Sequence, residues 1–186
     1  MIKIISGQYK GRMIPTLKNA TYRPSTSRLR ESLFNILCSP LYYEDHLLDA
    51  EVLDLYSGTG SLAFEALSRG AKSATLVDTD ENSLKNAKIF AEKIKRSEDV
   101  TCFKASAINL PYSGRSYNLI FMDPPYEKNL VDKTLISLTN QKWLKPGALI
   151  IIETEKKEDF KYPSEIVLLD ERKYGNSKLR IMRYGE

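Results

Sequence analysis

From residue 51 onward, short runs of β-branched and other apolar residues alternate with segments in which apolar residues recur at helical spacing. This alternation is typical of βαβ units and predicts a parallel sheet covered by helices. The expected strands are 51–56, 73–78, 100–105, 117–123 and 148–154, and the expected helices are 61–70, 82–95 and about 129–143. Gly70 would end the first helix, Asn82 would cap the second, and Pro146-Gly147 would stop the third.

The pattern changes after the fifth strand and also differs before the first. Residues 164–173 and 177–184 are extended runs joined by a turn that contains Gly-Asn, which predicts a hairpin. Residues 3–15 predict a second, small hairpin, and 28–38 predict an amphipathic helix whose apolar face holds Leu29, Leu33, Phe34 and Leu37. We therefore expect an α/β fold with the seven-stranded, Rossmann-like sheet of class I methyltransferases, its C-terminal antiparallel hairpin, and an N-terminal hairpin and helix extension.

Charge divides the chain into two parts. Residues 1–30 carry seven basic residues and no acid, whereas residues 31–186 carry 21 basic and 24 acidic residues, a net charge of −3. A charge run is often only a solvated face, but one this one-sided, interleaved with tyrosine and glycine, favours contact with a nucleic-acid backbone. Lys10, Arg12, Arg23 and Arg28 are the candidate RNA contacts, and Arg30 would instead pair with an acid of the main domain. The expected division is an RNA-contacting extension, 1–45, and a catalytic domain, 46–186.

Other features exclude several classes of protein. The first residues lack the apolar core of a signal peptide and no apolar run is long enough to span a membrane, so we expect a cytoplasmic protein. Separately, we expect a monomer. Cys38 and Cys102 lack metal-ligand spacing and are expected to be buried thiols, so no metal is expected. His46, the only histidine, lies in a polar connector and is expected to be solvated.

A glycine turn follows the first strand of the predicted sheet. Gly58 and Gly60 lie between a buried strand and a helix, but with Ala63 they also satisfy the dinucleotide-binding pattern. Asp54 distinguishes the two, because a carboxylate at the strand end would repel a pyrophosphate but favour the ammonium and sulfonium of S-adenosylmethionine. Asp78, at the end of the next strand, would accept hydrogen bonds from ribose hydroxyls in either cofactor. The alternatives are a helix-capping carboxylate and a plain tight turn.

The most specific motif is Asp123-Pro124-Pro125-Tyr126, which follows an apolar strand at the carboxyl edge of the predicted sheet. An exocyclic base amine is a poor nucleophile because its lone pair is delocalised into the ring. The Asp123 carboxylate and the Pro124 carbonyl could accept both amine hydrogens and aim the lone pair at a methyl group, while Tyr126 could stack on an extruded base. The alternative is a rigid turn with an aromatic plug.

These motifs resemble the RsmD family, bacterial methyltransferases of guanine N2 in 16S ribosomal RNA. The similarity covers nearly the whole chain and includes the segments 4–12 and 23–37, which are more specific than the glycine and Asp-Pro-Pro-Tyr motifs. The resemblance implies that Asp123 to Tyr126 hold the guanine, that the basic segment meets ribosomal RNA or the assembling small subunit, and that S-adenosylmethionine contacts Asp54, Ser57, Gly58, Gly60 and Asp78. Relatives often carry Asp or Asn at the adenine contact, where this chain has Ser106.

Three other functions remain open from the sequence. A DNA or other RNA amino-methyltransferase acting on adenine N6 or cytosine N4 could use the same motif, although residues 1–50 are a short segment for reading a DNA sequence. A nicotinamide-dependent oxidoreductase is disfavoured by Asp54 and by the terminal hairpin. A non-catalytic RNA-binding module is disfavoured by the intact Asp-Pro-Pro-Tyr motif.

Overall fold

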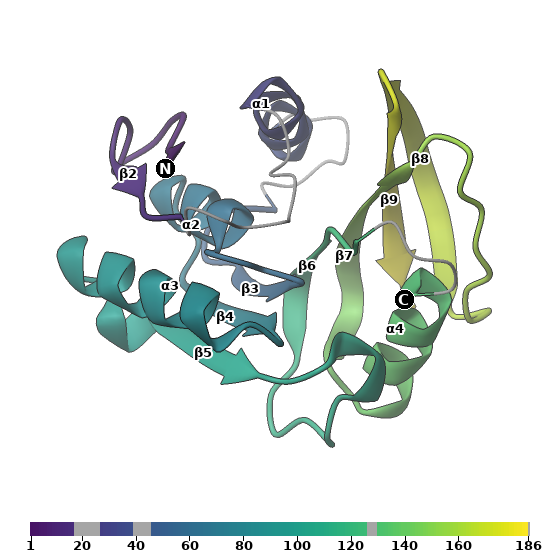
Figure 1. Cartoon of the computed structure of the whole chain (residues 1–186). Coiled ribbons are helices and arrows are strands. Elements are labelled where there is room, and N and C mark those ends of the chain that lie inside the picture. Colours follow the sequence, from purple (N-terminus) through teal and green to yellow (C-terminus); the bar gives the residue numbers. More distant parts are fainter. Residues whose placement is uncertain (17–26, 39–45, 126–129, 186) are drawn as a thin grey trace.

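The computed structural model describes residues 1–16, 27–38, 46–125 and 130–185, and side chains from Leu29 onward in the second range. A seven-stranded sheet forms its centre, in the order β5-β4-β3-β6-β7-β9-β8 (Figure 1). Its strands are β3 (Glu51–Leu55), β4 (Ser73–Asp78), β5 (Val100–Lys104), β6 (Tyr117–Met122), β7 (Leu144–Glu155), β8 (Ile166–Tyr174) and β9 (Ser177–Tyr184). The first five are parallel, and β9 runs antiparallel to both β7 and β8. The predicted parallel sheet with a terminal hairpin is confirmed.

Helices cover both faces of this sheet (Figure 1). Three helices, α1 (Ser27–Leu37), α2 (Ser61–Ser68) and α3 (Glu81–Lys93), share one core with the apolar side chains of one face. The opposite face packs against α4 (Leu130–Asn140) and the 3₁₀ turn η3 (Ala107–Asn109), and a further turn, η2 (Ser97–Asp99), precedes β5. The predicted apolar face of α1 is buried, and its Phe34 ring lies 5.7 Å from that of Phe121.

The N-terminal hairpin packs against the C-terminal turn of α2. Its strands, β1 (Ile2–Lys3) and β2 (Met13–Ile14), pair antiparallel, and the turn between them reaches Ser68. The backbone nitrogen of Gln8 donates to the Ser68 carbonyl at 2.7 Å, and that of Tyr9 donates to the Ser68 hydroxyl at 2.9 Å. The approach requires a glycine at position 7, where φ is +80° and a Cβ would lie 1.8 Å from the Ser68 carbonyl oxygen.

A buried carboxylate secures the same contact. Glu65 of α2 is 0% exposed, and its two oxygens accept hydrogen bonds from the backbone nitrogens of Ile5 (2.8 Å) and Ser6 (3.0 Å). Arg69 donates to the same carboxylate at 2.9 Å. Arg30 of α1 is buried nearby and donates to the Lys3 carbonyl; burial lowers its pKa, while the charge of Glu65 opposes that shift. The expected pairing of Arg30 with an acid is therefore electrostatic, through Glu65, and its described hydrogen bond is to the hairpin backbone.

Helix and strand boundaries differ from the predictions in three places. Asp80, rather than Asn82, caps α3, because its side chain accepts hydrogen bonds from the backbone nitrogens of residues 82 and 83. Helix α4 ends at Asn140, ahead of Pro146-Gly147, because Lys142 adopts φ +61° and the next backbone nitrogen bonds to the Leu138 carbonyl in a left-handed C-cap. Strand β7 starts at Leu144 and passes through Pro146, where its register against β6 is irregular.

The exposure of the two cysteines and of the single histidine also differs from the predictions. Cys38 is exposed and Cys102 is half-buried, so the prediction of two buried thiols is wrong for Cys38. Cys38 directly follows the last residue of α1, Leu37. His46 is half-buried rather than fully solvated. In the described ranges, no helix combines the length and apolar character that crossing a membrane requires.

Candidate active site

The predicted site residues follow or end strands at the carboxyl edge of the sheet, where α/β proteins of this kind bind ligands. Strand β3 is the centre of this edge, since Leu55 pairs with Val77 of β4 on one side and with Met122 of β6 on the other. The polar residues that follow these strand ends are therefore brought together although they lie up to 66 positions apart in sequence. They comprise Ser57 to Gly60 after β3, Asp78 at the end of β4, Ser106 after β5 and Asp123 after β6.

Residues 57–60, here called the cofactor turn, join β3 to α2. Gly58 and Gly60 both adopt left-handed conformations, with φ of +52° and +79°. Gly60 has a second requirement, because a Cβ there would lie 2.3 Å from the Leu76 side chain beneath it. The backbone nitrogen of Gly60 donates to the Ser57 carbonyl at 2.8 Å and closes the turn. The glycines therefore let the turn lie directly on the core while its other side stays available to a ligand.

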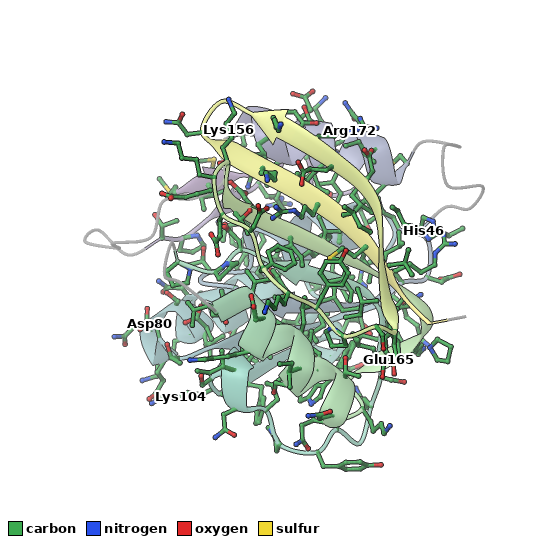
Figure 2. All side chains as sticks on the ribbon, turned by 90° about the vertical axis from the view of Figure 1, so that its right-hand side faces the viewer. His46, Asp80, Lys104, Lys156, Glu165 and Arg172 are labelled. Atoms are coloured by element: carbon green, nitrogen blue, oxygen red, sulfur yellow. The ribbon has the colours of Figure 1, made fainter. Side chains whose placement is uncertain are left out.

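Asp78 holds the cofactor turn from the neighbouring strand. Its Oδ2 accepts a hydrogen bond from the Gly58 backbone nitrogen at 2.7 Å, and its Oδ1 accepts one from Asp80 at 2.8 Å. Each carboxylate oxygen has a further lone pair, so ribose hydroxyls could still donate to Asp78. Figure 2 labels Asp80, the N-cap of α3, and Lys104, the last residue of β5, which lie on the same side of the molecule.

Asp54 is more buried than Asp78 and Asp123, the other two acids at this edge of the sheet. Its side chain is 2% exposed, and its Oδ2 accepts a hydrogen bond from the backbone nitrogen of Ala63, in the first turn of α2, at 3.0 Å. Burial raises the pKa of this carboxyl well above its ordinary range, the Ala63 hydrogen bond lowers it, and the charges of Asp123 and Asp78 raise it further. Asp123 and Asp78 thus both act on Asp54, and the three acids together favour a cation at this edge.

Two hydroxyls of the cofactor turn are buried without a hydrogen-bond partner among the residues that the structure describes. These are Ser57 Oγ and Thr59 Oγ1, and the Thr59 residue is only 1% exposed. A buried hydroxyl that bonds to nothing is costly, so such groups indicate a ligand or water that completes them. S-adenosylmethionine, with its carboxylate, ammonium and ribose hydroxyls, fits this donor and acceptor set. Thr59 was not among the predicted site residues, although its position between two glycines was a signal for it.

The Asp-Pro-Pro-Tyr motif begins directly after β6. Asp123 is half-buried, Pro124 is buried and Pro125 is exposed, whereas Tyr126 lies outside the described residues. Asp123 influences the pKa of Asp54, which places the two carboxyls close enough to interact. Ser106 is exposed, with no side-chain hydrogen bond to the η3 turn that follows it. Its hydroxyl is therefore not committed to capping that turn.

The predicted RNA contacts are described only in part. Lys10 and Arg12 are exposed on the N-terminal hairpin. Arg23 lies outside the described residues, and Arg28 is placed in α1 by its backbone alone. The hairpin packs on the C-terminal end of α2 and the cofactor turn precedes its N-terminal end, so the length of this eight-residue helix, about 12 Å, separates them.

Comparison with known proteins gives consistent results. A family model described as Conserved hypothetical protein 95 matches residues 2–183. Ribosomal RNA small subunit methyltransferase D from Haemophilus influenzae is 34% identical over 97% of this chain and 92% of the relative, and the protein of the same name from Escherichia coli K12 is 36% identical over 83% and 75%. The solved structure of yhhF from Escherichia coli has a TM-score of 0.85 at 32% identity and covers 99% of this chain and 98% of that one. The chain therefore belongs to the Conserved hypothetical protein 95 family, which is the RsmD family that its sequence resembles.

Proposed function

We propose that this protein transfers a methyl group from S-adenosylmethionine to the exocyclic N2 amine of a guanine in 16S ribosomal RNA. The observation that carries the proposal is the position of Asp123 and Pro124, directly after β6 and one strand away from the cofactor turn. The names of the relatives, ribosomal RNA small subunit methyltransferases, support the reaction type and the class of RNA.

The acceptor side of the reaction uses two oxygen atoms of the motif. The Asp123 carboxylate and the Pro124 carbonyl accept the two hydrogens of the amine, which draws the nitrogen toward tetrahedral geometry and points its lone pair at the methyl carbon. Two consecutive prolines restrict the backbone, so the acceptors stay fixed during the reaction. As the new N–C bond forms, the bond between the methyl carbon and the sulfonium breaks and the neutral thioether S-adenosylhomocysteine leaves. The methylated nitrogen is then acidic, and its proton passes to Asp123 or to water. Tyr126 stacks on the flipped base.

The donor side is held by the cofactor turn and the neighbouring strand ends. S-adenosylmethionine supplies an electrophilic methyl group on a sulfonium. Asp78 accepts hydrogen bonds from the ribose, Ser106 contacts the adenine, and the backbone of Gly58 and Gly60 approaches the ligand closely. Ser57 and Thr59 contribute the hydroxyls that lack partners among the described residues. Asp54 stabilises the cation by its charge and holds the turn to α2.

We propose a division of labour between residues 1–45 and 46–186. The first part contacts RNA through Lys10, Arg12, Arg23 and Arg28, and the second carries the methyl transfer. The two parts share one hydrophobic core, because Ile4, Ile14 and Leu33 pack in the same cluster as the sheet. Ribosomal RNA, or the assembling small subunit, is the proposed partner.

Mass spectrometry of ribosomal RNA nucleosides tests this function. Cells that lack the gene should lose one N2-methylguanosine from 16S RNA and regain it with the wild-type gene but not with Asp123→Ala. Loss of a methyladenosine or a methylcytidine would instead indicate an adenine N6 or cytosine N4 enzyme. Unchanged ribosomal RNA, with a changed DNA methylation pattern, would overturn the choice of nucleic acid.

A further inference from the structure

Tyr56 joins β3 to the cofactor turn in an unusual backbone conformation. Its φ is +57°, a left-handed value that side chains other than glycine rarely adopt. Among the described residues only three other non-glycine positions share this sign, namely Asp49, Lys95 and Lys142, and none of them adjoins the active site. Such a conformation persists when surrounding contacts hold the residue in place.

The side chain of Tyr56 provides such a contact. The ring packs against the core on the α4 face, and its hydroxyl lies 2.6 Å from Thr134 Oγ1. Thr134, which is fully buried, donates its only hydroxyl proton to the Leu130 carbonyl at 2.7 Å. Tyr56 must therefore be the donor in the bond with Thr134. The result is a directed chain of hydrogen bonds from Tyr56 through Thr134 to Leu130.

The two ends of this chain of hydrogen bonds belong to different elements of the fold. Tyr56 immediately precedes Ser57, the first residue of the cofactor turn. Leu130 is the first residue of α4, the helix that packs on the opposite face of the sheet from α2. The same helical turn is held on its other side, because Asp132 accepts a hydrogen bond from the Lys161 backbone nitrogen at 3.1 Å.

We propose that Tyr56 is a positioning residue that fixes the cofactor turn relative to Asp123 and Pro124 by anchoring it, through Thr134, to the first turn of α4. The proposal rests on the methyl transfer proposed above, in which the donor methyl and the acceptor nitrogen must be aligned. Misplacement by about 1 Å costs up to about 100-fold in rate, so a contact that fixes this alignment acts on turnover more than on binding.

Tyr56→Phe tests the proposal, with Tyr117→Phe as a matched control. Tyr117 is buried, whereas Tyr56 is half-buried, and the Tyr117 hydroxyl also bonds to a threonine, Thr75 Oγ1 at 2.9 Å, but Tyr117 begins β6 at the end opposite Asp123. Each variant loses one tyrosine–threonine hydrogen bond, and the loss of stability should be at least as large for Tyr117→Phe, whose hydrogen bond is the more buried. Tyr56→Phe should lower kcat about tenfold with cofactor and RNA affinities nearly unchanged, whereas Tyr117→Phe should keep its kcat.

Variants of Thr134 separate the hydrogen-bond chain from packing. Thr134→Ser keeps a hydroxyl that accepts from Tyr56 and donates to Leu130, so kcat should stay near the wild-type value. Thr134→Val keeps the shape and breaks the chain, so kcat should fall as in Tyr56→Phe, and the double variant should be no slower than either single one. Equal kcat for the Phe variants at positions 56 and 117, or full kcat in Thr134→Val, would overturn the proposal.

Hydrogen exchange, which requires no turnover, tests the role of Tyr56 separately from the proposed function. In the wild-type protein, S-adenosylhomocysteine should slow hydrogen exchange at the amides of residues 134 and 135, because the ligand contacts the cofactor turn and the chain extends to α4. That protection should persist in Thr134→Ser and disappear in Tyr56→Phe. Absence of methyl transfer by the wild-type protein would contradict the proposed function alone, whereas equal protection in wild type and Tyr56→Phe would contradict the role of Tyr56.

Discussion

The Oδ2 atom of Asp54 accepts a hydrogen bond from the backbone nitrogen of Ala63 at 3.0 Å, inside the core and away from solvent. This carboxylate therefore has two roles that make opposite demands on it. It holds the cofactor turn to the first turn of α2, and it supplies negative charge for a cationic ligand. Burial makes that charge costly in the ligand-free protein, and the first two predictions follow from this conflict.

Asp54→Asn should stabilise the protein at neutral pH. The amide oxygen of asparagine can still accept the Ala63 hydrogen bond, while the buried charge is removed. Burial raises the pKa of Asp54 in the folded state, so its favourable contribution to folding is fully present below the unfolded carboxyl value of about 4 and is lost as pH rises toward the raised value. Urea unfolding at several pH values should show a gap in favour of Asp54→Asn that grows with pH. A variant less stable than wild type at neutral pH would contradict this.

The same substitution should weaken S-adenosylmethionine binding. Removing a charge-assisted contact costs about 1.5–3 kcal/mol, or roughly ten- to hundredfold in affinity, which calorimetry can measure. Asp80→Asn is the matched control, because it removes one negative charge near the same edge and asparagine also caps helices well. Equal losses in the two variants would indicate a general field effect rather than a role specific to Asp54.

Asp123→Ala should abolish turnover and leave cofactor affinity nearly intact, because its proposed task is to orient the amine in the transition state. Tyr126→Ala should be less severe, since base stacking is worth about 1–3 kcal/mol. Single-turnover assays, with calorimetry of the cofactor on the same preparations, separate the two effects. Full activity in the Asp123 variant would refute its assigned role.

Replacing Lys10, Arg12, Arg23 and Arg28 together should flatten the slope of log RNA affinity against log salt concentration by about 3–4 units. Cofactor binding should not change, because the hairpin lies at the other end of α2 from the cofactor turn. A variant with Lys10 and Arg12 alone should lose about half of that slope. The paired control replaces Lys133 and Lys142, which are exposed on the α4 side of the sheet, and should keep the wild-type slope.

Gly7→Ala should loosen the N-terminal hairpin from α2. The new Cβ would collide with the Ser68 carbonyl and the backbone would be strained, whereas at Gly11, also at positive φ, a Cβ would meet only the Lys3 side chain at 4.0 Å. Gly11→Ala therefore measures the cost of the strained backbone alone, without a collision of the new Cβ. Thermal unfolding should show the larger loss of stability for Gly7→Ala, and RNA affinity should fall with it. Equal melting temperatures for the two variants would contradict the close contact described here.

The sequence was sufficient to predict the fold because its periodicity is strong at each buried strand. Errors occurred where a local hydrogen bond decided the boundary, as at Asp80, whose cap competes with that of Asn82, and at Lys142, which takes the left-handed position where glycine would have been recognised. In both places, the residue types alone do not distinguish the observed end of the helix from another position nearby.

The candidate site shows the same limit. Asp78 and Asp123 could be predicted because strand ends meet at one edge of a parallel sheet, which a linear pattern reveals. The contact of Tyr56 with Thr134 joins residues 78 positions apart through side-chain hydroxyls and leaves no periodic signal. Glu65 reads as an ordinary exposed helix acid, and only the packed hairpin shows that its carboxylate is buried and satisfied by backbone amides.

The burial of Glu65 beneath the hairpin also limits how far the chain can be shortened from its N-terminus without a loss of stability. A protein shortened to begin after residue 16 would keep every strand of the large sheet, but Glu65 would lose two of the three donors described for it, Ile5 and Ser6. Each such charge-assisted bond is worth about 1.5–3 kcal/mol, a large fraction of the stability of a small domain. The smallest autonomous folding unit therefore includes the basic hairpin, and a chimera that exchanges this hairpin between relatives has to carry the matching α2 with it.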